Sequence, residues 1–142
     1  MIAGDGVVSL CQPGPGDAEL LIAGRDEEFF RWLGPGSDAP APVACIWAGE
    51  RLVGWVDYDL GHAWLEPGQV NVGYCLFTAA RGQGYASRAV ELLLAHLRRD
   101  TEHTEATLLI HPENTRSLAL AHRLGFVQKG EINGQPFFTR SV

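Results

Sequence analysis

Apolar residues recur along the chain with two periods, and the change of period separates predicted strands from predicted helices. Residues 43–48 and 52–60 are short runs rich in β-branched and aromatic side chains around Gly49-Glu50-Arg51, and they predict a β-hairpin. A further strand is expected over residues 69–77. Beyond it the spacing becomes helical, which predicts a helix to about Leu97 with a buried stripe of Ala86, Val90, Leu93, Leu94 and Leu97.

The other parts of the chain follow the same two patterns. Asp17 is expected to cap one helix, and Asn114 and Gly125 are placed to begin and end another. Asn133-Gly134 is a strong signal for a hairpin turn. The further predicted elements are a strand over residues 7–11, helices over residues 17–22, 26–33 and 114–124, and strands over residues 105–110, 126–132 and 135–141.

The order of these elements predicts a single α/β domain over residues 1–142. The length suffices for one hydrophobic core, and 46% hydrophobic with 20% charged residues is ordinary for a globular protein. A formal net charge of -6 argues against a nucleic-acid partner, which usually meets a basic surface. The acidic balance suits a partner that carries an amine, although such a balance often serves solubility alone.

The cysteines, the N-terminal residues and the length of the apolar runs indicate the cellular compartment. Cys11, Cys45 and Cys75 are odd in number and lack a CxxC spacing, so we expect reduced thiols in the cytoplasm and no metal site. The N-terminus has neither the basic segment nor the apolar segment of a signal peptide. No apolar run approaches the length of a membrane span, so no membrane partner is expected.

The most informative local feature is the turn Arg81-Gly82-Gln83-Gly84-Tyr85-Ala86-Ser87 between a predicted strand and a predicted helix. Glycines before a helix start expose backbone N–H groups at the positive end of the helix dipole, which favours a phosphate. A plain turn is one alternative. A dinucleotide-binding loop is another, but Ser87 stands where its third glycine belongs, and no Gly-Lys-Ser/Thr follows for a P-loop.

Two blocks of sequence resemble a known family. Arg81-x-x-Gly84-x-Ala86 is similar to the acyl-CoA signature of the GNAT superfamily of N-acetyltransferases. The block from His111 to Ser117, together with Leu124-Gly125-Phe126, resembles the branch of the ribosomal-protein alanine acetyltransferases. The resemblance covers about residues 69–127. It implies an α/β (α+β) fold with a mixed, mostly antiparallel sheet of about seven strands, four helices, and a splay between the fourth and fifth strands.

The resemblance also implies where coenzyme A binds. The strand end Leu76-Phe77-Thr78 would pair its backbone with the pantetheine arm, and a backbone N–H near Cys75 or Leu76 would stabilise the oxyanion. Arg81 has two open roles, a contact to the phosphates or a surface salt bridge. Asn114 would cap its helix and also contact pantetheine or water. Pyrophosphate would be held by the backbone of Gly82, Gln83, Gly84, Tyr85, Ala86 and Ser87.

The residues that move protons are harder to assign. Many superfamily members carry a tyrosine acid where this chain has Ala121, and some carry a glutamate base where it has Asn71. The resemblance suggests Ser117 as the acid, although completing the first helical turn is an equal alternative. His111 is the candidate base because imidazole titrates near neutral pH. Asp57 and Tyr58 on a predicted strand are further candidates for the base, and His62 and Glu66 in a loop are weaker ones. A chain of water molecules that relays the proton to solvent is another alternative.

Two functions follow from these expectations. In the first, acetyl-CoA donates an acetyl group to a primary amine, on a protein N-terminus or a small molecule, by direct attack in a ternary complex. In the second, the chain is a non-catalytic acyl-CoA sensor or accessory module. The acceptor is expected in a shallow groove, with a homodimer as a candidate to complete it, lined by Phe29, Phe30, Trp32, Tyr58 and Phe137.

Overall fold

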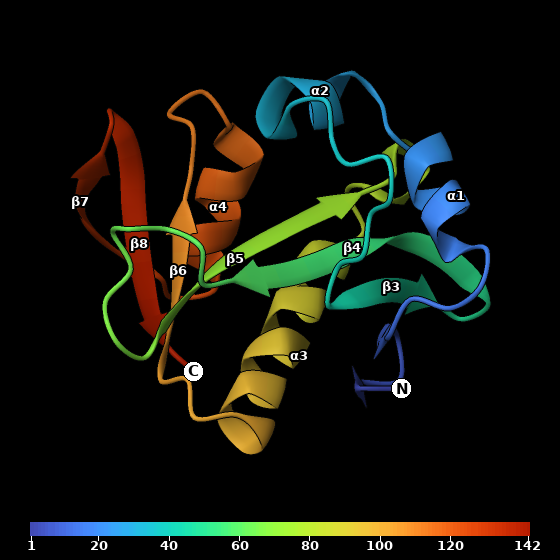
Figure 1. Ribbon diagram of the computed structural model, residues 1–142, viewed down its shortest axis with the longest axis horizontal. Helices are drawn as coiled ribbons and strands as arrows, with labels where there is room; N and C mark the ends of the chain where they lie inside the picture. The colour runs from blue at the N-terminus through green and yellow to red at the C-terminus, as the bar shows by residue number, and fades with distance from the viewer. The chain divides into compact units, whose positions relative to one another are not determined.

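The computed structural model describes residues 1–142 as four α-helices and one open sheet of eight strands in the order β1-β2-β3-β4-β5-β6-β8-β7 (Figure 1). The helices are α1 (Asp17–Ala23), α2 (Glu27–Leu33), α3 (Tyr85–Asp100) and α4 (Thr115–Arg123), with a 3₁₀ turn, η1 (Thr78–Ala80). The strands are β1 (Ala3–Gly4), β2 (Ser9–Cys11), β3 (Ala44–Ala48), β4 (Arg51–Asp59), β5 (Gln69–Leu76), β6 (Glu105–Leu109), β7 (Val127–Ile132) and β8 (Gln135–Ser141).

The chain forms two compact units, each made of two segments. The first unit comprises Met1–Asp57 and Tyr74–Leu93, and the second comprises Tyr58–Gly73 and Leu94–Val142. The expected α/β fold with four helices and a mixed sheet is confirmed. The sheet has eight strands rather than about seven because the two residues of β1 pair with β2, a strand too short for a sequence pattern to reveal. One domain over the whole chain stays a prediction.

The first unit is built on an antiparallel run of strands. Cys11 of β2 pairs with Cys45 of β3, and Ala44 of β3 pairs with Val56 of β4. In the core of this unit, Leu10, Ile46 and Val56 are completely buried. Asp17 was expected to cap α1, but Gly16 occupies the N-cap without a side-chain bond. Asp17 is instead the first helical residue, and its carboxylate accepts the N–H of Gly14 at 2.8 Å.

The second unit contains the closing hairpin, in which β8 lies between β6 and β7 (Figure 1). Asn133 and Gly134 both adopt positive φ angles, 52° and 79°, as the predicted hairpin turn requires. Helix α4 packs onto this sheet, where the ring of His122 meets the buried ring of Phe138 edge-on at 5.8 Å. Asn114 caps α4 by accepting the N–H of Ser117 at 3.3 Å, as predicted.

The predicted splay is present within the second unit. β5 and β6 are parallel and pair from Gln69↔Glu105 to Asn71↔Thr107, where their pairing ends. β6 nevertheless continues on its other side and pairs with β8 as far as Leu109↔Phe137. We call the opening beyond Asn71 and Thr107 the fork.

No helix of the structure combines the length and the apolar character needed to cross a membrane.

Candidate functional site

The glycine turn has the geometry expected of an anion cradle. Gly82 and Gly84 adopt φ angles of 79° and 81°, which L side chains rarely accept, and a Cβ on either would meet no atom within 4 Å. The space over the turn is therefore open, and both glycines are exposed. The first backbone bond of α3 runs from Arg88 N–H to the Gly84 carbonyl at 3.2 Å. The N–H groups of Tyr85 and Ala86 thus belong to the first turn of the helix, where backbone N–H groups have no intrahelical acceptor.

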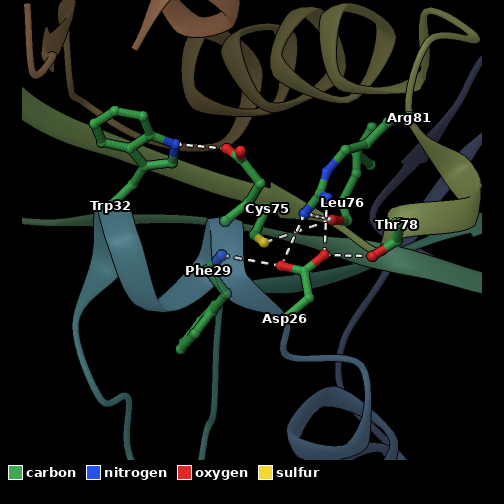
Figure 2. Close-up of polar contacts among 8 residues, drawn as sticks. Asp26, Phe29, Trp32, Cys75, Leu76, Thr78 and Arg81 are labelled. Carbon is green, nitrogen blue, oxygen red and sulfur yellow. Dashed lines mark hydrogen bonds and ion pairs between the residues drawn. The ribbon is translucent and has the colours of Figure 1, made fainter. Parts of the chain in front are cut away.

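Arg81, at the start of this turn, was expected either to contact the phosphates or to form a salt bridge, and in the structure it forms a salt bridge. Its guanidinium donates to both carboxylate oxygens of Asp26, at 2.8 and 3.2 Å, and to the Leu76 carbonyl at 2.9 Å (Figure 2). The side chains of Arg81 and Asp26 are only 18% and 24% exposed. The pair therefore joins the end of β5 to the loop before α2, and it fixes the chain that leads into the glycine turn.

Asp26 has further contacts that make it the centre of this network. Its carboxylate accepts the hydroxyl of Thr78, and it caps α2 by accepting the N–H of Phe29 at 3.0 Å (Figure 2). The hydrogen bond from Arg81 is the main cause that holds the pKa of Asp26 well below its usual range, and the bonds from Thr78 and Phe29 act in the same direction against burial. The same hydrogen bond raises the pKa of Arg81.

Sequence reasoning did not find Asp26. Its position before Glu27-Glu28 shows only a helix start, because an N-cap aspartate followed by acidic residues is common at helix N-termini. Its partner Arg81 lies 55 positions away along the chain. No local pattern links residues at that separation, so the network is visible only in the folded chain.

The strand end before η1 presents its backbone in two directions. The N–H of Phe77 donates to the Val53 carbonyl at 2.8 Å, and a Cβ on Gly54 would overlap the carbonyl oxygen of Cys75, so both groups face β4. Because backbone groups alternate along a strand, the N–H of Leu76 points away from β4. Among the expected groups of this strand end, Leu76 is therefore the donor best placed for a ligand, while the N–H of Phe77 is already used.

The ring of Phe77 and the thiol of Cys75 have structural surroundings. A Cβ on Gly24 would overlap the ring of Phe77, so this ring packs directly on the end of α1. Burial raises the pKa of the Cys75 thiol to about 11, which leaves almost no thiolate at neutral pH. Cys75 is half-buried rather than fully buried, but the interpretation that it is not a nucleophile fits its protonated state.

The predicted catalytic residues lie in the second unit, at the turn into α4. His111 is exposed, and its Nδ1 accepts the N–H of Glu113 at 3.1 Å. Ser117 is half-buried and gives its backbone N–H to the cap residue Asn114. The structure therefore supports a structural role for each residue, and their expected parts in proton transfer stay predictions.

The expected aromatic groove divides into several environments. Phe29 is 6% exposed and belongs to the core, which corrects its assignment to the groove, whereas Phe30 is 52% exposed. Trp32 is half-buried and donates its indole N–H to Glu28 at 2.7 Å. In the second unit, Tyr58 meets the ring of His103 and Phe137 meets the ring of Trp64.

Comparisons with known proteins agree with one another. A family model described as an acetyltransferase (GNAT) domain matches residues 9–127 and so includes segments of both units. No curated protein sequence matches the chain.

Three solved structures illustrate the similarity of fold. Mycobacterium smegmatis RimJ in complex with CoA-disulfide is 19% identical at a TM-score of 0.79, over 96% of this chain and 83% of that one. RimL, a ribosomal L7/L12 α-N-protein acetyltransferase in complex with coenzyme A, is 16% identical at a TM-score of 0.81, over 99% and 97%. An aminoglycoside acetyltransferase in complex with coenzyme A and kanamycin is 18% identical at a TM-score of 0.79, over 94% of each chain.

Proposed function

The chain belongs to the GNAT acetyltransferase family and is an N-acetyltransferase, and we propose that it moves an acetyl group from acetyl-CoA to a primary amine. The observation that carries this proposal is the turn around Gly82 and Gly84, which leads directly into α3 and where a Cβ on either glycine would meet no atom within 4 Å. A pyrophosphate is the group that such a helix start accepts best.

The residues present fit coenzyme A. We assign the pyrophosphate to the backbone N–H groups of Gly82, Gln83, Gly84, Tyr85, Ala86 and Ser87. Arg81 supports this turn through its ion pair with Asp26. Thr78 is proposed to offer its backbone to the pantetheine arm, and Asn114 is the proposed contact from the second block of the sequence. When bound, acetyl-CoA supplies an acetyl group that is activated as a thioester.

The chain's part in the chemistry is to orient the reactants and stabilise developing charge. The N–H of Leu76 is the proposed donor to the acetyl oxygen, where negative charge grows as the amine attacks directly in a ternary complex. Ser117 is the proposed proton donor that the family resemblance suggests, and His111 is one candidate for the proton acceptor. A thiol pKa of about 8.5 makes the leaving group tolerable, so the donor matters less than the acceptor.

The acceptor class is inferred from relatives and from charge. The solved relatives include enzymes named for ribosomal protein L7/L12 and for aminoglycosides, and kanamycin is bound in one of them. The net charge of -6 suits amines, which are cationic at neutral pH. We therefore propose a protein N-terminus or a small polyamine-like molecule as the acceptor. A cytoplasmic location and a homodimer belong to the same proposal.

The cofactor assignment is tested by calorimetric titration with acetyl-CoA. Gly84→Glu places a carboxylate where the phosphates are proposed to bind, and we expect the affinity to fall at least about 100-fold through repulsion and lost close approach. Gly134→Glu is the matched control, since Gly134 has a φ of 79° and equally open space but lies in the closing hairpin. An unchanged affinity for the Gly84 variant would show that the pyrophosphate binds elsewhere.

Turnover is tested by thiol release from acetyl-CoA with a panel of amines. The panel consists of peptides with N-terminal alanine, serine or methionine, together with kanamycin and spermidine. Thiol release that depends on the amine is the expected result. Tight binding of acetyl-CoA without release for any amine would instead support the non-catalytic module.

A further inference from the structure

At the apex of the fork, in the second unit, a buried threonine holds the side chain of an asparagine. Thr107 of β6 is completely buried, and its hydroxyl donates to the side-chain oxygen of Asn71 on β5 at 3.3 Å. This bond fixes the amide of Asn71 at the point where the two parallel strands stop pairing. Backbone edges that part in this way are available to a ligand that pairs like a strand.

The loop after β4 brings an imidazole to this apex. Nε2 of His62 lies 3.5 Å from the side-chain nitrogen of Asn71 and 3.0 Å from Oδ1 of Asp59. The imidazole is stacked on Trp64 with the centroids 4.8 Å apart and an interplanar angle of 22°. Trp64 in turn meets Phe137 edge-on at 5.3 Å. Asp59, Asn71 and Trp64 therefore contact this ring directly, and Phe137 supports it through Trp64.

The contacts also define which nitrogen of His62 can take up a proton. Nε2 lies 3.0 Å from the carboxylate of Asp59, which accepts hydrogen bonds, so the proton of the neutral ring is on that nitrogen. The amide nitrogen of Asn71 is also a donor, so its approach to Nε2 at 3.5 Å is then a packing contact and not a hydrogen bond. The neutral ring then keeps its lone pair on Nδ1. Asp59 is the charged group in contact with the imidazole, since the other groups that face it, on Asn71 and Trp64, are neutral. The side chain is 40% exposed, so it can exchange protons with water.

We propose that His62, oriented by Asp59, is the proton acceptor for the attacking amine at the fork. This inference rests on the proposed acetyl transfer. Amines with pKa values of about 8 to about 10 are mostly ammonium ions at neutral pH and must lose a proton before they attack. His62 accepts that proton at Nδ1 while Nε2–H stays bonded to Asp59. The neutral amine forms the new C–N bond as the C–S bond breaks, its second proton leaves on the thiol, and His62 returns its proton to water.

His62 suits this role better than His111. Nδ1 of His111 already accepts the backbone N–H of Glu113, so that lone pair is occupied by the turn before α4. Nδ1 of His62 has no such backbone donor, and a carboxylate supports the ring from the opposite nitrogen. This arrangement of carboxylate, imidazole and substrate proton is the common geometry of a general base held by a third group.

The test compares His62→Gln and His62→Ala with His96→Gln. The control removes a second histidine–aspartate pair, His96 Nδ1 with Asp100 at 2.8 Å, which lies on α3 and not on the fork strands β5 and β6. With acetyl-CoA and the amine of the panel that wild type acetylates, we expect kcat/KM at pH 7 to fall about 100-fold or more for both His62 variants. The control should stay within about threefold, and acetyl-CoA affinity should be unchanged in all three variants.

Two readouts separate proton transfer from a structural role. The loss in His62→Gln should shrink as pH rises toward the pKa of the amine, because more of the substrate is then already neutral, and added imidazole should restore turnover to His62→Ala. Independently of activity, nitrogen NMR of the imidazole should show the Nε2–H tautomer in the wild type and a tautomer mixture in Asp59→Asn.

Each outcome decides the inference. Full activity in His62→Gln, or a loss that is equal at every pH and resists imidazole, would overturn the role of His62 while leaving the acetyltransferase proposal intact. An Nδ1–H tautomer in the wild type would overturn it as well. A wild-type chain that acetylates no amine of the panel overturns the proposed function and this inference with it.

Discussion

Two carboxylates in this molecule, Asp26 and Asp59, hold nitrogen-bearing side chains in different ways. Asp26 binds Arg81 through two hydrogen bonds, with both side chains less than one quarter exposed and two further donors on the same carboxylate. Asp59 binds His62 through one contact, with side chains 52% and 40% exposed and three positions apart. The first pair joins segments that are distant in the sequence, and breaking it would leave a half-buried charge without a partner. The second pair is open to water. The Asp26–Arg81 pair therefore makes its surroundings rigid, whereas the His62 ring of the second pair is open to proton exchange with water.

The largest expected effect on stability is at Gly54 of β4, the strand that packs against the end of β5 in the first unit. Gly54→Ala would drive a Cβ into the backbone carbonyl of Cys75, which cannot move without disrupting β5. We expect the free energy of unfolding to fall by about 3 kcal/mol, the upper end for overpacking. Gly61→Ala is the control in the loop that carries His62, because its nearest atom is 3.8 Å away, and it should change stability by less than about 0.5 kcal/mol. Equal effects in urea denaturation would contradict the contrast.

The next effect concerns Asp26 itself. Asp26→Ala removes the cap of α2 and leaves Arg81 without its carboxylate, so we expect a loss of about 2 kcal/mol in unfolding free energy. A double-mutant cycle with Arg81→Met should show coupling of about 1 kcal/mol or more. Acetyl-CoA affinity should fall in parallel, because the glycine turn loses its support. Additive single effects would show that the ion pair contributes nothing.

Acid provides a third test of the same pair. The folded-state pKa of Asp26 lies below its unfolded value, so its contribution is fully present above about pH 4 and is lost as pH falls below that value. The unfolding free energy of the wild type should therefore decrease more steeply below pH 4 than that of Asp26→Asn. Denaturation series between pH 5 and pH 2 measure this slope, and parallel slopes for the two proteins would argue against the pair as its source.

The smallest effect on stability is expected at the exposed pair. Asp59→Asn should change the unfolding free energy by less than about 1 kcal/mol, since exposed ion pairs contribute little. The same variant should lower acetyl transfer about tenfold, because it removes the partner that holds the tautomer of His62. A stability loss as large as that of Asp26→Ala would remove the distinction between the two pairs.

How far the sequence predicts this molecule depends on the distance between interacting residues. Helix α3 and the hairpin at Asn133-Gly134 were predictable because periodicity and turn chemistry are local. The glycine turn was recognisable for the same reason. Asp26 and Arg81 are in contact although 55 positions separate them in the sequence. His62 lies beside Asn71 because the loop after β4 folds back toward β5. Such contacts depend on tertiary packing, so no spacing rule in the sequence predicts them.

The outer strand β7 has a consequence for how copies of this chain meet. It pairs on one side only, with β8, and a bulge between Gln128 and Gly130 interrupts its register. The exposed charges of Lys129 and Glu131 lie along it. A kinked and charged border is a poor template for another chain to extend by strand addition. This border therefore protects the chain against edge-to-edge polymerisation during synthesis and storage at high concentration, and a homodimer would have to form through another surface.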